Sequence, residues 1–210
     1  LIGGQIDLMF RVDEGRRLAV SGVDIQGNAG VSDQQVVGAM ATRPEGFLFT
    51  KKGELDADKY AADVSQNIPT LYAQKGYLDA QVLKDTVKVD RDKGKALVDI
   101  TVKEGPRYRI GTFEVTGSKH FSSEDLARFY PFGAQPKSLT SAVKGLVQIG
   151  KGNSDDALYF DQSRWDEATR SVGEAYANEG YIYANVRPVV ERVKAGPDSV
   201  PTVNLRWEVD

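Results

Sequence analysis

The chain repeats itself along its length. A shift of 90 residues aligns Val12-Asp13-Glu14-Gly15 with Val102-Lys103-Glu104-Gly105, and the match continues without a gap into the next segment. Farther on, a helical run that ends in Gly76-Tyr77 matches a second run that ends in Gly180-Tyr181. A self-similarity of roughly 100 residues constrains the fold more than any single residue does, because both copies have to build the same unit. The sequence therefore predicts a tandem array of one small domain.

Each copy begins with a strand and a short helix. Weak apolar alternation predicts a first strand at 18–25 and at 108–115, with a bulge near Gly22 or Gly111. A serine followed by acidic or amide residues at capping-box spacing then predicts the start of a short helix in both copies. A longer helix comes next, and its apolar residues recur at the three-to-four spacing that suits packing on a sheet.

Two further strands complete each copy. They are predicted at 80–89 and 96–102 in the first copy and at 183–193 and 202–209 in the second, because their alternation indicates one buried face. The order of elements is β-α-α-β-β. The predicted fold class is therefore α+β, with two tandem domains that each place two helices on one face of a three-stranded sheet.

The two long helices differ in length by one residue. Their predicted starts, Asp56 and Asp161, lie 105 residues apart, whereas their predicted ends, Gly76 and Gly180, lie 104 apart. The extra residue of the first copy is expected near Pro69, where a helix is kinked or bulged in any case. Both glycines are expected in the left-handed conformation that ends a helix.

The repeat also predicts how the chain is divided. Residues 1–14 match the last strand of a preceding unit, residues 15–104 one complete unit, and residues 105–210 a second unit with a long insertion at about 131–159. The chain thus reads as an excerpt from a longer array. The inter-domain hinge is expected at Glu104, Gly105 and Pro106, because a proline restricts the residue before it and stiffens the join.

Composition argues against several classes of protein. The net charge is −3 and both signs are interspersed, so a basic face that binds nucleic acid is not expected. The 210 residues include no cysteine, which excludes a disulfide scaffold and thiol chemistry. The apolar runs are all much shorter than the roughly 20 residues that a membrane-spanning helix needs.

Candidates for catalysis or metal binding are weak. Gly145 to Lys151 resembles a phosphate-binding loop, but Gly152 stands where that motif needs a hydroxyl group, and no apolar strand leads into it. His120 is the only histidine, and no nucleophilic constellation surrounds it in the sequence. The aspartates between 85 and 92 lack the spacing and the glycine of a calcium-binding loop. We therefore expect no catalytic residue, no metal site and no cofactor.

The main chain offers a stronger candidate. A three-stranded sheet leaves two open edges, and an open edge accepts an incoming strand by β-augmentation. The strands predicted at 80–89 and 183–193 are long for a small domain, and they carry charges of the kind that limit aggregation. We expect both to be edge strands that bind clients or partners. The candidate residues are Gln81, Leu83, Asp85, Val87, Asn185, Arg187, Val189 and Glu191.

Taken in order, these elements resemble the POTRA family. The resemblance rests on the first strand that ends at Gly27-Asn28, on the long helices that end in Tyr-x3-Gly-Tyr at 72–77 and 176–181, and on the closing Val-Lys-Glu-Gly at 102–105. It covers nearly the whole chain and is greatest for the periplasmic portion of BamA-type outer-membrane proteins. The resemblance implies a mixed three-stranded sheet in each unit and no catalytic residues.

The resemblance also implies a function and partners. It makes the chain a non-enzymatic periplasmic module that helps to assemble and insert β-barrel proteins into the outer membrane. The expected partners are unfolded outer-membrane proteins, periplasmic accessory lipoproteins and a C-terminal membrane β-barrel in the parent chain. Two alternatives stay open: the POTRA region of a TamA-like or two-partner secretion transporter, and a scaffold or division protein that organises partners without handling unfolded chains.

Overall fold

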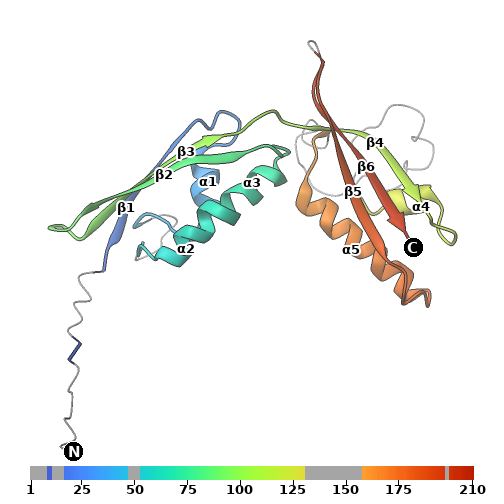
Figure 1. The fold of residues 1–210 in the computed structure, drawn as a ribbon, viewed down its shortest axis with the longest axis horizontal. Helices are drawn as coiled ribbons and strands as arrows, with labels where there is room; N and C mark the ends of the chain where they lie inside the picture. Colours follow the sequence, from blue (N-terminus) through green and yellow to red (C-terminus); the bar gives the residue numbers. More distant parts are fainter. Residues whose placement is uncertain (1–8, 11–16, 47–52, 131–157, 197–198) are drawn as a thin grey trace, which may run out of the picture.

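A computed structural model describes residues 9–10, 17–46, 53–130, 158–196 and 199–210. The strand expected in residues 1–14 and the insertion expected at 131–159 lie almost wholly outside these ranges. Within them, two three-stranded sheets follow one another along the chain, each with its helices on one face (Figure 1). We refer to residues 17–104 as the first unit and to residues 105–210 as the second unit.

In the first unit the last strand lies in the middle of the sheet. The strand order is β1-β3-β2, with β1 parallel to β3 and β2 antiparallel to it, so the sheet is mixed as expected. The elements are β1 (Ala19–Gln26), α1 (Asp33–Ala39), α2 (Ala57–Ala62), the π-helical turn η2 (Asp63–Asn67), α3 (Ile68–Gln74), β2 (Gln81–Asp90) and β3 (Lys95–Lys103).

The second unit repeats this plan. The strand order is β4-β6-β5, again with one parallel and one antiparallel pair. The elements are β4 (Arg109–Thr116), α4 (Ser123–Ala127), α5 (Gln162–Asn178), β5 (Val186–Val193) and β6 (Thr202–Val209). The start predicted for β5 at 183 was wrong. The chain first makes a turn in which the N–H of Ala184 donates to the carbonyl of Tyr181 at 3.0 Å.

The extra residue of the first long helix forms a π-helical turn. The helical run from α2 to α3 passes through η2 immediately before Pro69, whereas α5 is one uninterrupted helix of 17 residues. A π turn inserts one residue into a helix without breaking it. This confirms the predicted bulge near Pro69 and explains why the two copies lose register by one position.

Glycine is required where each first strand leaves the sheet. Gly27 has φ +84° and Gly117 has φ +80°, and a Cβ atom on either would lie 2.0 Å from the carbonyl oxygen of Val102 or Val209. A side chain cannot fit at that distance, and the positive φ favours glycine as well. The turn therefore holds the end of the first strand close against the end of the last strand in both units.

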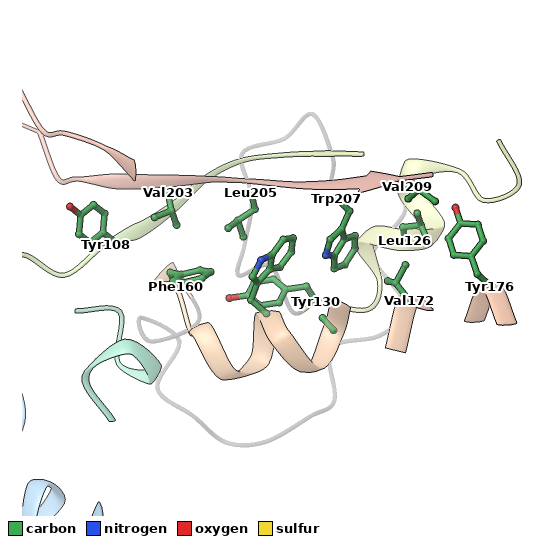
Figure 2. Packing of buried hydrophobic residues seen from close by; sticks show 12 residues of the cluster. Tyr108, Leu126, Tyr130, Phe160, Val172, Tyr176, Val203, Leu205, Trp207 and Val209 are labelled. Carbon is green, nitrogen blue, oxygen red and sulfur yellow. The ribbon is translucent and has the colours of Figure 1, made fainter. Parts of the chain in front are cut away.

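The two units have separate apolar cores. In the second core, Trp165 from α5 stacks on Trp207 from β6 with ring centroids 4.7 Å apart, and Tyr130 meets Trp165 edge-on. Figure 2 shows Val203, Leu205 and Trp207 projecting from β6 toward the helix. The first core is mainly aliphatic. Its buried residues are Val20, Ile25, Val31, Val36, Val37, Met40, Ile68, Tyr72, Val98, Ile100 and Val102.

Candidate strand-binding edges

The structure places β2 and β5 at the edges of their sheets. The opposite edges are partly covered. The N–H of Val20 in β1 donates to the carbonyl of Gly53 at 2.6 Å, and the N–H of Phe160 donates to the carbonyl of Tyr108, beside β4, at 3.1 Å. Within the described part of the chain, no strand or loop pairs with the outer sides of β2 and β5. These two strands are therefore the open edges.

The parallel pairing of β1 with β3 fixes which main-chain groups of β2 face outward. The N–H of Ala19 donates to the carbonyl of Gly94 at 3.0 Å. Ala19 lies opposite Lys95, and in a parallel pair a residue bonds the two neighbours of the residue opposite it. The main-chain groups of Lys95 therefore face away from β1, toward β2, where they pair with Asp90. Antiparallel strands alternate between bonded and non-bonded pairs. Counting back from Asp90, the main-chain N–H and C=O groups of Asp85, Val87 and Val89 point away from the sheet.

In β5 the same count gives a different edge. Asn185 and Asp210 exchange two main-chain hydrogen bonds, both of 3.1 Å, at the start of the ladder with β6. The ladder continues without a register shift, so alternation makes Arg187, Val189 and Glu191 bonded partners of β6. The outward-facing positions are 186, 188, 190 and 192. Position 188 is a proline, which has no N–H to donate, so the row of donors on β5 is interrupted.

The predicted edge residues therefore divide into two groups. In β2, Asp85 and Val87 turn their main-chain groups outward, as an incoming strand needs. Leu83 is the extra residue of a β-bulge between Val82 and Lys84, and its side chain is 59% exposed. Gln81, by the same alternation, turns its main-chain groups toward Lys103 of β3. Arg187, Val189 and Glu191 of β5 turn theirs toward β6, and Asn185, just before β5, turns its own toward Asp210. An added strand would use the positions between them.

One charged side chain on each edge strand has a partner within its own sheet. Lys88 in β2 pairs with Asp99 in β3 at 2.7 Å, and the hydrogen bond to that carboxylate raises the pKa of Lys88. Arg187 in β5 pairs with Glu208 in β6, and its hydrogen bond lowers the pKa of Glu208. These exposed pairs contribute little stability but place charge beside the open edges.

The residues considered for catalysis and metal binding are scattered or not described. His120 lies beside Tyr181, with its Nδ1 atom 3.3 Å from the hydroxyl oxygen, and its Nε2 atom is 3.8 Å from a carboxylate oxygen of Glu179. The segment 145–152 is outside the described residues. Within the described ranges, His, Asp and Glu side chains form no group of three or more that is suited to a metal ion. None of the described helices is long and apolar enough to cross a membrane.

The two units meet at the end of α3. The N–H of Tyr108 donates to the carbonyl of Gly76 at 2.9 Å, and the Nε of Arg107 donates to the carbonyl of Lys75 at 2.7 Å. The carboxylate of Asp79 accepts from the hydroxyl of Tyr108 at 2.7 Å and from Arg192 of β5 at 2.6 Å. Main-chain and side-chain contacts thus join the two units directly, in addition to the linker.

The residues of the predicted hinge make contacts of their own. The carboxylate of Glu104 is largely buried and accepts from the N–H groups of Gly30 and Val31 at 2.9 and 3.1 Å. Gly105 has φ +70°, and a Cβ atom there would lie 3.1 Å from the Cβ of Asp79. Glu104 therefore anchors the end of β3 to the turn before α1, and Gly105 lets the chain pass close to the junction. A hinge role for residues 104–106 stays a prediction.

The geometry agrees with a known protein family. The family model described as POTRA, surface antigen variable number repeat, matches residues 18–105 and 108–210. The chain belongs to the POTRA family. A crystal structure of POTRA domains 3 to 5 of BamA from Haemophilus influenzae matches 94% of this POTRA chain with a TM-score of 0.60 at 20% identity, and the match covers 67% of that structure.

Curated relatives of this POTRA chain are much longer proteins. A putative outer membrane protein assembly factor of Treponema pallidum is 32% identical over 85% of the chain and 19% of that protein. The outer membrane protein assembly factor BamA of Neisseria meningitidis serogroup B is 25% identical over 73% of the chain and 20% of that protein. The chain thus spans about a fifth of the relatives it matches. It is a periplasmic POTRA region of the BamA-like kind.

Sequence reasoning identified the edge strands but not their outward positions. The predicted residues take the same places after Gly76 and after Gly180, whereas the bulge at Leu83 shifts the outward positions of β2 by one residue relative to those of β5. The contacts of Asp79 were missed because they join residues far apart in the chain. Pro188, however, is visible in the sequence. A proline in a predicted strand indicates an edge position.

Proposed function

We propose that this POTRA region is a non-enzymatic module that helps to assemble β-barrel proteins in the outer membrane, and that unfolded client strands pair with the edge of β2. The observation that carries the proposal is the uninterrupted outer row of β2. Asp85, Val87 and Val89 all turn N–H and C=O groups outward, and none of them is a proline. An extended segment of any sequence with alternating side chains pairs with such a row.

The names of the relatives support the assembly role. The proteins from Neisseria meningitidis and Treponema pallidum are both described as outer membrane assembly factors, one of them putatively. Clients of such a factor are chains that will become β-strands, and their alternation suits addition to a sheet edge. We extend the role to this chain, with accessory lipoproteins and a membrane β-barrel in the parent protein as further partners.

The energetics favour short-lived binding. A main-chain hydrogen bond contributes about 1 kcal/mol net, and three outward residues of β2 offer at most about six such bonds. Association and the ordering of an unfolded segment cost a similar amount or more. Side chains packed beside β2, such as the half-exposed Val89, have to supply the difference. Weak pairing of this kind suits a surface that passes each client on.

The two units supply a matched test. The ladders place Pro188 of β5 at the position that Asp85 occupies in β2, because their partners Trp207 and Ile100 occupy the same place in the central strands. Asp85→Pro therefore removes the outward N–H donor from β2, at a position where the fold accepts a proline in the other unit. Asp85→Ala is the control, because it removes the same carboxylate and keeps the N–H.

Binding is measured with a fluorescent peptide that corresponds to one strand of an outer-membrane β-barrel. We expect Asp85→Pro to weaken binding by about tenfold, which corresponds to about 1.4 kcal/mol, and Asp85→Ala to leave it within about threefold. Pro188→Val, which completes the row on β5, is expected to add binding at that edge. Unchanged affinity in a folded Asp85→Pro variant would exclude pairing at β2.

A further inference from the structure

The helix side of β2 carries one charge in an otherwise apolar row. Four residues of β2 pair with buried residues of β3, and they are Val82, Asp85, Val87 and Val89. Residues that lie opposite each other in a ladder have their side chains on the same face of the sheet. The four side chains therefore lie on the face that the helices cover (Figure 1). A strand added to β2 meets an apolar surface that a single carboxylate interrupts.

Asp85 lies where an added strand covers it. It is opposite the buried Ile100, but it is itself exposed because β2 is an edge strand. Burial, and then the negative charge of Asp85, raise the pKa of Tyr60 in α2, which agrees with a carboxylate close to that hydroxyl. Covering a carboxylate without giving it a partner is costly. The side chain that an incoming strand places beside Asp85 therefore affects how tightly the strand binds.

The opposite face of β2 carries positive charge. Lys84 and Lys88 pair with Thr101 and Leu97 of β3, which alternate with the buried residues of that strand, so both lysines lie on the face that the helices leave open. Asp99 neutralises Lys88 in part through their ion pair of 2.7 Å. The two faces of this edge therefore differ in the sign of their charge as well as in polarity.

From this arrangement we infer that Asp85 selects among client strands, and that β2 prefers a strand with one basic residue in its apolar face and no basic residue on its polar face. The inference rests on the strand pairing proposed above and adds the class of strand. A lysine or arginine packs its aliphatic stem against Val82 and Val87 and brings its charge to Asp85. An apolar side chain there covers the carboxylate without a partner, and an acidic one is repelled.

The ends of membrane strands have this pattern. The lipid-facing row of such a strand is apolar across the bilayer core, and a charge on that row costs little only near the interfaces. A segment that runs from the apolar band into the interface can therefore carry a basic residue in its apolar face. We expect these segments to bind β2 more tightly than the centres of membrane strands, whose apolar row is uninterrupted.

A simpler role for Asp85 is to protect the edge from aggregation. An inward-pointing charge on an edge strand discourages pairing with other chains, and so does a proline, which stands at the equivalent place in β5 as Pro188. A residue with that role alone weakens the binding of all strands alike. A selective residue ranks them by the charge that they place beside it, so a comparison of two peptides separates the two roles.

The two peptides have the same composition. Each alternates apolar and polar residues and contains one lysine and one glutamate. The first peptide has lysine in its apolar face and glutamate in its polar face, and the second has the two exchanged. The apolar face packs on the helix side of β2 whichever way the peptide runs. We expect this chain to bind the first peptide about tenfold more tightly, measured by fluorescence anisotropy at low salt, and the difference to shrink as salt is added.

Three variants assign the preference to one side chain. Asp85→Asn keeps the shape and removes the charge, and we expect the preference to fall to about twofold, the part that the exposed Lys84 contributes. Asp85→Lys should reverse it in favour of the second peptide. Asp92→Asn, which removes a negative charge from the exposed turn between β2 and β3, is the control and should leave the preference unchanged. Equal binding of the two peptides to the unaltered chain, or a preference that survives Asp85→Asn, would overturn the inference.

Failure of the pairing and failure of the selection give different results. The peptide used with Asp85→Pro is chosen without a charge in its apolar face, so it reports on main-chain pairing alone. If Asp85→Pro leaves its affinity unchanged, strands do not pair with β2 and both proposals fail. If Asp85→Pro weakens binding while the two charged peptides bind equally well, only the selection by Asp85 fails.

Discussion

The first unit holds its long helix with a buried carboxylate, and the second unit holds its helix with stacked aromatic rings. In the first unit Asp63 is fully buried at the start of η2, and it accepts from the N–H groups of Ala41 and Thr42 at 2.6 and 2.8 Å and from Asn67 at 2.7 Å. In the second unit Ala168 occupies the matching position, and the helix packs through Trp165, one turn earlier.

The two units share one backbone plan but use different side chains to pack the long helix. Both units need a long helix pressed on the central strand, and the backbone plan is the same. Asp63 is the first residue of the π-helical turn, and it bonds the chain that leaves α1. Without that turn the second unit buries an alanine there and gains its contact area from two tryptophans instead. The pattern of apolar positions thus fixes the fold, and the chemistry at each position is free to change.

The largest expected effect comes from removing one tryptophan of the stack. Trp165→Ala leaves a cavity beside Trp207, and we expect it to lower the free energy of unfolding of the second unit by about 4 kcal/mol. Tyr60→Ala, at the matching position of the first unit, is expected to cost about 1 to 2 kcal/mol because Tyr60 is only partly buried. Denaturant unfolding followed by circular dichroism checks both. Equal losses in the two units would contradict the comparison.

A somewhat smaller effect is expected from the buried carboxylate. Asp63→Ala leaves the N–H groups of Ala41 and Thr42 without their acceptor, and we expect a loss of about 3 kcal/mol in the first unit. The matched control is Ala168→Gly, which alters the equivalent helix position of the second unit without removing a hydrogen bond and costs about 1 kcal/mol. Both tryptophans lie in the second unit, so their fluorescence reports on that unit alone. The fluorescence transition should stay unchanged in Asp63→Ala if the units unfold separately.

The smallest effect on stability is expected at the junction. Asp79→Ala removes the partly exposed pair with Arg192 and the bond from the Tyr108 hydroxyl, and we expect it to change the free energy of unfolding by less than about 1 kcal/mol. It should instead widen the range of orientations between the units. Distances between spin labels on the two units measure this range. Asp58→Ala, a change of an exposed carboxylate within the first unit, is the control that should leave the distribution unchanged.

The sequence predicted the plan of the fold well because its signals are local. The capping serines Ser32 and Ser122, the glycines that end the long helices and the bulge near Pro69 all act within a few residues, and the structure confirms each of them. The start of β5 was predicted too early, because apolar residues at 181–183 extend the strand pattern although they form a turn.

The candidate edges depend on information that is not local. Which main-chain groups face outward is set by the pairing with the central strand, and a single bulge at Leu83 changes the count. The same holds for Asp79 and Arg192, which are 113 residues apart in the chain. A strand pattern indicates which side chains are buried, but it does not carry the register of the hydrogen bonds.

The parallel pairing of the first and last strands determines how each unit responds to tension. The chain enters a unit at the start of its first strand and leaves at the end of the neighbouring last strand, which runs the same way. A pull on the two ends therefore slides these strands along each other, and all the hydrogen bonds between them bear the load together rather than breaking one after another. A tandem array built in this way resists stretching along its axis, so a force applied at one end is carried through every unit to the other.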